Sequence, residues 1–315
     1  MRPIGWCAAM IGGWIALTAT VGCDDERPLA FEEPQPISQP SNQPQPAGQP
    51  AANAEFDPRA CGDVRGFIRW TGPLPTVPTI DHPEVVAGSS IAWTKFANPH
   101  APRVDPHSLG VGDAVVYLRG VSPMSSLSMV QRARRWDHPP VRVEARERLL
   151  HVYQGPRIGL VGVVRVGDQI ELVSRSQSYH AVAGRGAAFF AATLPVPDRP
   201  VTRQLTTPGL VELTSAAGHY WARAWLFVCE HPYWTLTNPD GSFAIEQVPA
   251  GQYELVVWHA NPHICVRQRD PESTLVTRLT FAAPLEWKVP VVVEAGGQSP
   301  VCATLNESLF PRACP

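Results

Sequence analysis

The sequence predicts an all-β protein built from tandem β-sandwiches. Short apolar runs rich in Val, Ile, Tyr and Trp recur between Gly, Pro and Asp turn signals. Long helical periodicity is lacking, and one short helix is expected over Ser125–Trp136, closed off by Pro139 and Pro140. Many short strands joined by Gly/Pro turns are typical of β-sandwiches.

The expected strands share a high content of β-branched and aromatic residues, and most are bounded by turn residues. Two turns are strongly marked, at Asn238–Gly241 and at Pro249–Gly251, and each is expected to join two strands as a hairpin. In chain order the strands are expected over residues 64–70, 112–118, 140–145, 159–166, 168–174, 209–215, 223–228, 242–248 and 253–259.

The chain begins with the layout of a secretory signal. Arg2 is followed by an apolar run and by small residues before Cys23. The ending TVGC resembles a bacterial lipoprotein box, although Thr20 departs from the usual Leu. We therefore expect a signal peptide over 1–22, lipidation at Cys23 and a membrane-anchored protein on the periplasmic side of the cell envelope. A plain signal peptide, which would give a secreted protein, and a retained helix are the alternatives.

Residues 23–59 are rich in Pro, Gln, Asn and Ala and hold few large apolar groups. Such a segment cannot bury enough surface to offset its ordering entropy. Its prolines favour extended conformations, so we expect a disordered, semi-stiff tether between the anchor and the folded part.

The net charge bears on the partners of the protein, and the cysteine content bears on its disulfides. The formal net charge of the 315 residues is -2, so nothing indicates nucleic acid as a partner. Export makes disulfides plausible, but an odd number of cysteines beyond the tether leaves at least one unpaired within the chain. Candidate pairs are Cys302 with Cys314, which would close a C-terminal loop, and Cys229 with Cys265. The five cysteines are Cys61, Cys229, Cys265, Cys302 and Cys314.

Three blocks of strands carry two resemblances. In block 229–315, TNPDGSFAIEQVPAGQYELVVWH resembles the carboxypeptidase-regulatory-like (transthyretin-like) domain, a structural or binding module. In block 142–228, PRIGLVGVVRVGDQIELVSRSQSYHAV and PGLVELTSAAGHYWARAW resemble the strands and ligand loop of a cupredoxin. The resemblance implies a cupredoxin-like Greek key followed by a transthyretin-like sandwich. Block 60–141 is expected to be a separate N-terminal β domain or an extension of the cupredoxin.

The cupredoxin resemblance places a histidine ligand at His180 and a second at His219. In that family the short loop reads C-x-x-H-x-x-M, which would put Ala216 in the cysteine place and Ala222 in the methionine place. A blue copper centre needs a thiolate. Cys229 lies ten residues past His219, at the far end of the next expected strand. We therefore predict no blue copper centre and no resident cofactor.

Two histidines remain as a candidate metal site. His180 and His219 are expected at one end of the sandwich, where two imidazoles can bind Cu(II) or Zn(II) weakly. A third ligand would strengthen the site, and the competing interpretation is that both are remnants hydrogen-bonded to backbone. The candidate third ligands are His151, His231, His259 and His263.

Other constellations are weaker. Gly184 and Gly186 form a lone G-x-G, which usually marks a turn. A Ser178–His180–Asp198 set lacks the G-x-S-x-G motif of a nucleophile elbow. Trp225 and Trp258 are expected in the core or between domains, whereas Trp221 and Trp234 fit either packing or a stacking surface for sugars or a partner. The basic run Arg132–Trp136 is expected to form a solvated loop face.

These observations predict a protein without enzymatic activity. The first hypothesis is a lipid-anchored binding or scaffolding module of the cell envelope, whose partner is an envelope protein or a glycan. The alternative is a copper- or zinc-binding protein, or a redox partner, that uses His180 and His219.

Overall fold

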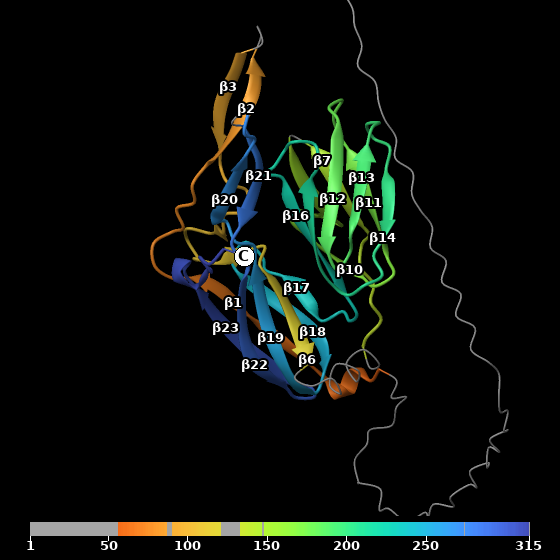
Figure 1. Cartoon of the computed structure of the whole chain (residues 1–315). Coiled ribbons are helices and arrows are strands. Elements are labelled where there is room, and N and C mark those ends of the chain that lie inside the picture. The colour runs from red at the N-terminus through yellow and green to blue at the C-terminus, as the bar shows by residue number, and fades with distance from the viewer. Residues whose placement is uncertain (1–55, 87–89, 121–132, 147, 274, 315) are drawn as a thin grey trace, which may run out of the picture. The chain divides into compact units, whose positions relative to one another are not determined.

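The computed structural model describes residues 56–86, 90–120, 133–146, 148–273 and 275–314 (Figure 1). In this part of the chain it contains strands β1 to β23, two 3-10 turns and no α-helix. None of its elements is a helix with the length and hydrophobicity needed to cross a membrane. The predicted all-β class is confirmed.

Several predictions fall outside the described residues. These are the signal peptide over 1–22, the lipidation site Cys23 and the tether up to residue 55. Most of the predicted short helix also lies there, as does Arg132. The described end of that helix, residues 133–136, has no regular secondary structure, so the prediction is wrong for this part.

One sandwich is built from ten consecutive strands, and we call it the inserted sandwich. Two five-stranded sheets face each other, and each contains one parallel pair, β7–β11 in the first and β10–β16 in the second. The first sheet has the order β14 (Val201–Gln204), β11 (Gln169–Ser174), β7 (Val141–Arg146), β8 (Leu149–Gln154) and β9 (Arg157–Gly159). The second has the order β10 (Val161–Arg165), β16 (Arg223–Cys229), β15 (Gly209–Ser215), β12 (His180–Gly186) and β13 (Phe190–Leu194).

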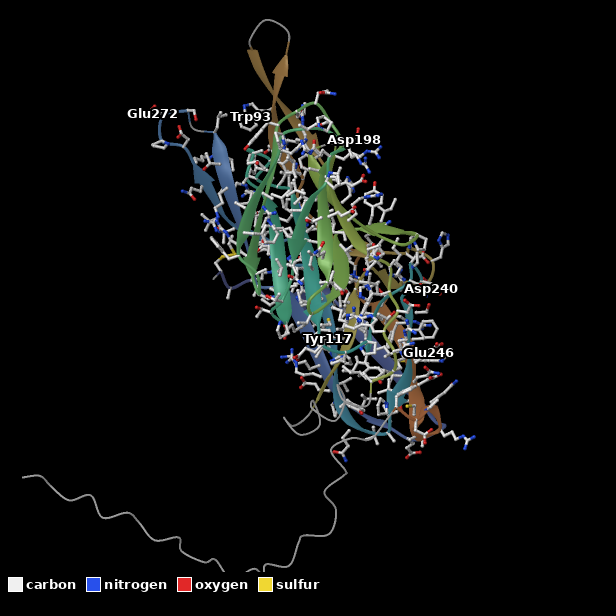
Figure 2. All side chains as sticks on the ribbon, turned by 90° about the vertical axis from the view of Figure 1, so that its right-hand side faces the viewer. Trp93, Tyr117, Asp198, Asp240, Glu246 and Glu272 are labelled. Carbon is white, nitrogen blue, oxygen red and sulfur yellow. A yellow bond between two sulfur atoms is a disulfide. The ribbon has the colours of Figure 1, made fainter. Side chains whose placement is uncertain are left out.

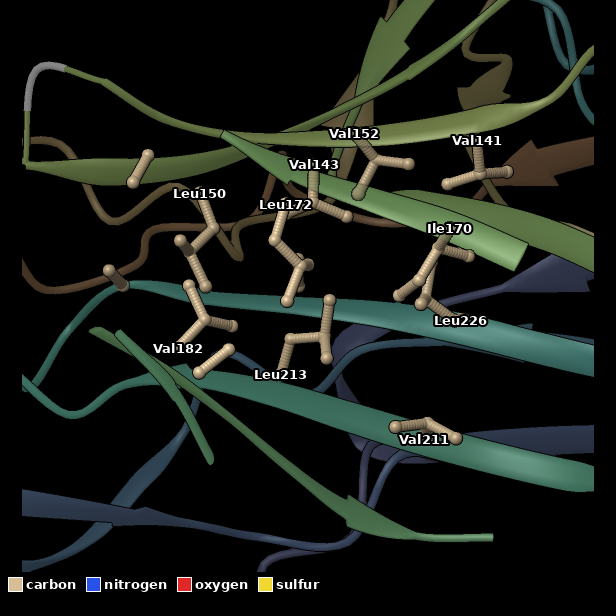
Figure 3. Close-up of a cluster of buried hydrophobic side chains, with 14 of the residues drawn as sticks. Val141, Val143, Leu150, Val152, Ile170, Leu172, Val182, Val211, Leu213 and Leu226 are labelled. Carbon is tan, nitrogen blue, oxygen red and sulfur yellow. The ribbon is translucent and has the colours of Figure 1, made fainter. Parts of the chain in front are cut away.

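Alternating apolar residues form the core of the inserted sandwich (Figure 3). Along β7, Val141 and Val143 are buried and meet Leu226 and Leu213 of the opposite sheet in the same cluster. Successive side chains of a strand point to opposite faces, so this alternation fixes which face is buried. The predicted strands over 140–145, 159–166, 168–174, 209–215 and 223–228 are all present.

The other sandwich, which we call the host sandwich, takes strands from both ends of the described chain. Its core joins Val64 and Ile68 of the first strand to Leu255 and Val257 near the other end. One sheet has the order β18 (Ser242–Pro249), β1 (Cys61–Trp70) and β23 (Gln298–Leu305). The second has the order β17 (Trp234–Leu236), β6 (Val115–Gly120), β19 (Gly251–His259) and β22 (Leu285–Val293).

The structure therefore divides the chain differently from the three predicted blocks. β1 pairs with β18 and β23, and β6 pairs with β17 and β19, so block 60–141 contributes strands to the block that follows residue 229. The inserted sandwich begins after β6 and ends before β17. The physical reason is that Val64, Ile68, Val116 and Leu118 are buried in a core that only the C-terminal strands complete.

One disulfide is present among the described residues, and it joins Cys265 to Cys314. Cys229 and Cys302 are free thiols, so neither candidate pair from the sequence forms. Cys61 is buried, and its Sγ donates a hydrogen bond to the Asp57 carbonyl at 3.2 Å.

Three hairpins complete the fold, and Trp93 of the first is labelled in Figure 2. The hairpins are β2 (Ile80–Val86) with β3 (Ser90–Phe96), β4 (Arg103–Val104) with β5 (Val111–Gly112), and β20 (Ile264–Arg269) with β21 (Val276–Phe281). The 3-10 turns are η1 (Pro58–Ala60) and η2 (Glu307–Leu309).

The two marked turns are present, but they join sheets and do not form hairpins. The turn at Asn238–Gly241 connects β17 to β18, and the turn at Ala250 connects β18 to β19; in both cases the two strands belong to opposite sheets of the host sandwich. Gly241 has a φ of 80°, and a Cβ there would overlap the carbonyl oxygen of Ile68. Glycine therefore allows the turn to pack closely against β1.

An apolar seam holds the two sandwiches together. Trp258 of β19 makes edge contacts with Trp225 and Phe227 of β16, with ring centroids 5.6 and 5.1 Å apart. Val115 and Val163 belong to the same buried cluster. The expectation that Trp225 and Trp258 serve in packing between domains is confirmed. We call this seam, together with the residues that border it, the junction.

Candidate functional site

His180 opens β12 and is buried. Its Nε2 lies 2.8 Å from Oγ of Ser176, a residue that sequence reasoning did not single out. Burial lowers the pKa of His180, so the imidazole is neutral near neutral pH. A neutral imidazole is the form that binds a metal ion.

His219 lies in the loop between β15 and β16. The loop is closed by bonds from the Ala222 amide to the His219 carbonyl (2.8 Å) and from the Ser215 amide to the Ala222 carbonyl (3.1 Å). The Ala216 amide donates to the Ala181 carbonyl at 2.8 Å and ties the loop to β12. The two imidazole centroids are consequently 5.4 Å apart, at an interplanar angle of 44°.

No sulfur atom of the described residues accompanies these imidazoles. Ala216 and Ala222 stand in the loop, and Ala222 is buried in the core of the inserted sandwich. Cys229 ends the seven-residue strand β16 that begins after this loop, a separation of roughly 20 Å at about 3.3 Å per residue. Burial raises the pKa of the Cys229 thiol to about 12, so it is not a thiolate near neutral pH. The residues present do not fit a blue copper centre.

The other histidines do not extend this pair into a larger donor set. The described residues hold no group of three or more His, Cys, Asp or Glu side chains that could bind a metal ion. His231 instead stacks on Tyr233 at 5.7 Å, and burial lowers its pKa to about 4. His151 and His259 line a cavity at the junction. His263 accepts a bond from the Ala282 amide through its backbone carbonyl.

The other candidate sites from the sequence do not form in the structure. Asp198 pairs with Arg175 at 2.6 Å, and His180 binds Ser176, so the Ser178–His180–Asp198 set does not assemble. The lone G-x-G lies within strand β12. Gly186 has a φ of 105°, and a Cβ there would overlap the carbonyl oxygen of Leu210. It therefore serves close strand packing.

The junction holds a cavity of about 290 Å³. Its walls come from both sandwiches: Trp225 and Ile158 from the inserted one, and Trp258 and His259 from the host. Burial lowers the pKa of His259, and its Nδ1 donates to the Ala260 carbonyl at 2.7 Å. At the rim, Arg103 and Asp113 form an ion pair at 2.7 Å. The cavity thus combines apolar walls with a few polar groups, a combination typical of binding sites for small molecules.

His100 lines the same cavity and is absent from the sequence-based candidates. Its ring meets Trp225 and Phe281 edge-on, at 5.3 and 5.2 Å. Burial, reinforced by the nearby charge of Arg223, lowers its pKa to about 3. The Nε2 donates to the Trp221 carbonyl at 3.2 Å, which leaves Nδ1 as a buried acceptor without a hydrogen-bond partner among the described residues. No motif around residue 100 marks this position, because its surroundings come from β16 and β21.

Comparisons with known proteins give limited matches. Residues 204–262 match the model of a family described as polysaccharide lyase family 4, domain II, a range that spans the end of the inserted sandwich and the start of the returning host strands. The matched family is not the carboxypeptidase-regulatory-like family. The resemblance of block 229–315 to that family therefore stays a prediction. Curated proteins yield no match.

Two solved copper proteins align with part of the chain. A Cu-containing nitrite reductase (NirK) from Thermus scotoductus SA-01 aligns with 17% identity and a TM-score of 0.24, over 31% of this chain and 24% of its own length. A methionine-to-alanine mutant of amicyanin with Cu(I) aligns with 16% identity and a TM-score of 0.24, over 36% of this chain and 98% of its own. These scores support no inference about function. The cupredoxin resemblance rests on the sequence pattern that places His180 and His219.

Proposed function

We propose that the protein is a non-enzymatic binding or scaffolding module of the cell envelope, exported and held at the membrane through a lipid on Cys23. The β-sandwich architecture fits a non-catalytic module. The inserted sandwich serves as a docking unit, and the partner is an envelope protein or a glycan. The match to domain II of a polysaccharide lyase family is consistent with an accessory role.

The observation that supports this proposal is the construction of the junction. The apolar seam fixes the two sandwiches against each other, and the cavity draws its walls from both. A recess that exists only when two sandwiches are joined is a common place for a ligand site. The insertion of one sandwich into the other is what creates it.

Photo-crosslinking in intact cells tests the binding role. A photoreactive amino acid replaces Ile158, which lines the cavity and is 56% exposed; the matched control position is Val292 on β22, which is 57% exposed. We expect a discrete adduct from position 158 and none from position 292. Equal labelling at both positions, or none at either, contradicts a partner at the junction.

The anchor is tested separately. A Cys23→Ser variant removes the thiol that would carry the lipid and is expected to move from the membrane fraction to the soluble fraction. Ser replacement at the free, exposed Cys302 is the control and should leave the protein membrane-bound. A Cys23→Ser protein that stays in the membrane fraction contradicts lipid anchoring at this residue.

A second candidate function is binding of Cu(II) or Zn(II) by His180 and His219. The 5.4 Å separation of the two ring centroids favours it. Titration of the purified protein with Cu(II) and Zn(II) by calorimetry tests it, with a His180→Ala/His219→Ala variant for comparison. One-to-one binding that the double variant loses would establish this site. Binding that is equal in both proteins, or absent, leaves the module without a metal role.

A further inference from the structure

A second hollow borders the junction and is separate from the cavity. It is a groove of about 420 Å³, which we call the Trp136–Trp234 groove. Its walls come from the segment before β7, from the β8–β9 turn and from strands β17 and β18. Trp136 and Trp234 are both half-buried, and their ring centroids lie 6.2 Å apart at an angle of 57°. Two indoles at an angle in a groove offer faces on which a ring can stack.

Two donors beside this groove lack acceptors. Nε1 of Trp234 and Nε of Arg134 are buried and have no hydrogen-bond partner among the described residues. A buried donor without an acceptor is costly, and such groups are usually satisfied by water or a ligand. Because both groups are donors, the missing partners are acceptors. Acceptor atoms of a ligand in the groove would supply these missing partners.

The charges around the groove favour an anionic ligand. Neither Arg134 nor Arg157 forms an ion pair within the described part of the chain, and Arg157 only donates to the Leu236 carbonyl and to Oδ1 of Asn238, both at 3.2 Å. Glu246, labelled in Figure 2, also lines the groove but pairs with Arg65 at 3.0 Å. Asp137 is the other carboxylate of the lining. Among the described residues, the groove lining therefore holds two arginines without a carboxylate partner, Arg134 and Arg157, against one carboxylate without an arginine partner, that of Asp137.

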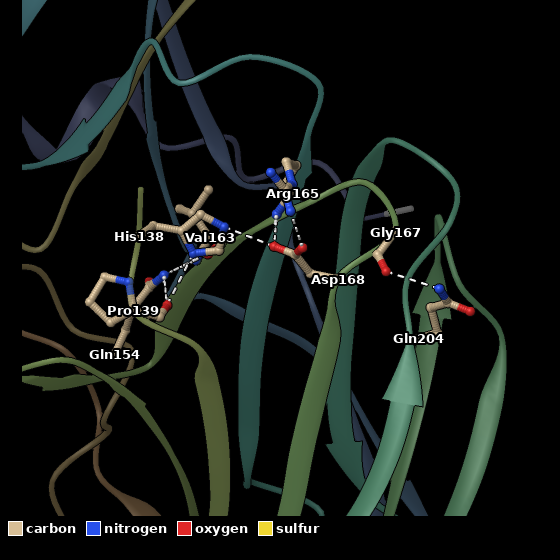
Figure 4. Close-up of polar contacts among 8 residues, drawn as sticks. All are labelled: His138, Pro139, Gln154, Val163, Arg165, Gly167, Asp168 and Gln204. Atoms are coloured by element: carbon tan, nitrogen blue, oxygen red, sulfur yellow. Dashed lines mark hydrogen bonds and ion pairs between the residues drawn. The ribbon is translucent and has the colours of Figure 1, made fainter. Parts of the chain in front are cut away.

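The segment that carries Arg134 and Trp136 is held in place on both sides. On one side, Nε2 of His138 lies 2.8 Å from Oδ2 of Asp168, and the Gln154 side chain donates to the Pro139 carbonyl at 3.3 Å (Figure 4). On the other side, the Arg134 amide donates to the Tyr233 hydroxyl at 3.3 Å. An ordered groove loses less conformational entropy when a ligand binds.

We infer that the Trp136–Trp234 groove binds an acidic sugar residue of a glycan. The sugar ring stacks on an indole face, and its carboxylate or sulfate oxygens accept hydrogen bonds from Arg134, Arg157 and Trp234. Guanidinium groups suit such oxygens because they bind them in a bidentate manner. The inference deepens the proposed binding role and rests on it, since it names a ligand class for the junction.

Direct binding measurements on the purified protein test this inference. The probes are uronate and sulfated oligosaccharides, with a size-matched neutral oligosaccharide and a poly-glutamate peptide of the same charge. We expect the acidic oligosaccharides to bind more tightly than both controls, and the affinity to fall as the salt concentration rises. Equal binding of the neutral sugar or of the peptide, or no binding of any acidic oligosaccharide, overturns the inference.

Variants locate the binding. Trp136→Ala and Arg134→Gln are expected to weaken it at least tenfold. Arg203→Gln is the control for the loss of one guanidinium, because Arg203 lies over the ring of Phe190 and does not line the groove; this variant should bind like the unaltered protein. Unchanged thermal unfolding midpoints show that the variants are folded. Binding that survives both groove variants overturns the inference, whereas a crosslink at position 158 would still support a partner at the junction.

Discussion

The two sandwiches reach similar architectures by opposite routes along the chain. The inserted sandwich uses consecutive strands from Val141 to Cys229, so its pairings form within one short stretch. The host sandwich closes only when β1, at residues 61–70, pairs in parallel with β23, at residues 298–305. Pairing of strands that are distant in the sequence costs more loop-closure entropy, and this entropy is lost before the stabilising contacts form. The host therefore depends on pairings between the two ends of the described chain, and the inserted sandwich depends on pairings within residues 141–229.

The two sandwiches also differ in what they offer to a ligand. The inserted sandwich keeps two imidazoles at one end but lacks the sulfur that would make a copper centre there. Neither sandwich holds a group of three or more metal-binding side chains among the described residues. Two recesses that combine apolar and polar groups lie where the two sandwiches meet. Binding at the two proposed sites would therefore depend on the assembly of the sandwiches.

The largest effect is expected from a change that blocks the long-range pairing of the host. In Gly66→Val, the new Cβ would overlap the Val301 carbonyl across the β1–β23 pair. We expect a loss of more than about 4 kcal/mol in the free energy of unfolding, measured by denaturant titration. Gly159→Val on β9 has open space around the new Cβ and should change it by less than about 0.5 kcal/mol. A Gly66→Val protein with unchanged stability would show that the close packing of β1 against β23 is not required for the fold.

The next largest effect is expected from a change in the apolar seam between the two sandwiches. Trp258→Ala removes the indole that packs on Trp225 and Phe227, at an expected cost of about 3–5 kcal/mol. We also expect one calorimetric transition to become two, because the seam couples the sandwiches. Trp287→Ala, which alters packing within the host alone, should keep a single transition. A single transition in Trp258→Ala would show that other contacts couple them.

A smaller effect concerns acid stability at the junction. The pKa of His100 is lowered from 6.5 to about 3, so the unfolded chain binds a proton first as the pH falls. The contribution of neutral His100 to the free energy of unfolding is therefore largest above pH 6.5. This contribution decreases as the pH falls from 6.5 towards about 3, because the unfolded chain is protonated and the folded one is not. Between about pH 7 and pH 5 the loss is about 2 kcal/mol. Denaturant titrations at both pH values should show this loss reduced in His100→Gln; an identical pH dependence in both proteins contradicts the assignment.

The smallest effect is expected at the rim of the cavity. Arg103 and Asp113 pair at 2.7 Å, but their side chains are 73% and 41% exposed. Exposed ion pairs stabilise a fold by less than about 1 kcal/mol because water and salt screen them. Arg103→Ala should therefore change the unfolding midpoint only slightly. A large shift would mean that the rim is an integral part of the seam.

The strands were accessible from the sequence, because alternation of apolar and polar residues is a local signal. The runs from Val64 to Trp70 and from Tyr253 to His259 lie within β1 and β19. The proximity of His180 and His219 followed from a family resemblance. His100 and the Trp136–Trp234 groove could not be found in this way, since their surroundings are assembled from distant strands with no shared motif.

By itself, the sequence determined that the chain folds into β-sandwiches and that the loop around His219 has no sulfur donor, because alternation and side-chain chemistry belong to each residue. Only the tertiary structure decided that β1 and β6 complete the C-terminal sandwich, that Cys265 pairs with Cys314, and that the junction is hollowed on its borders. Alternating strands resemble one another, so pattern alone does not select their partners. The selection is made by the fit of buried side chains across the whole fold.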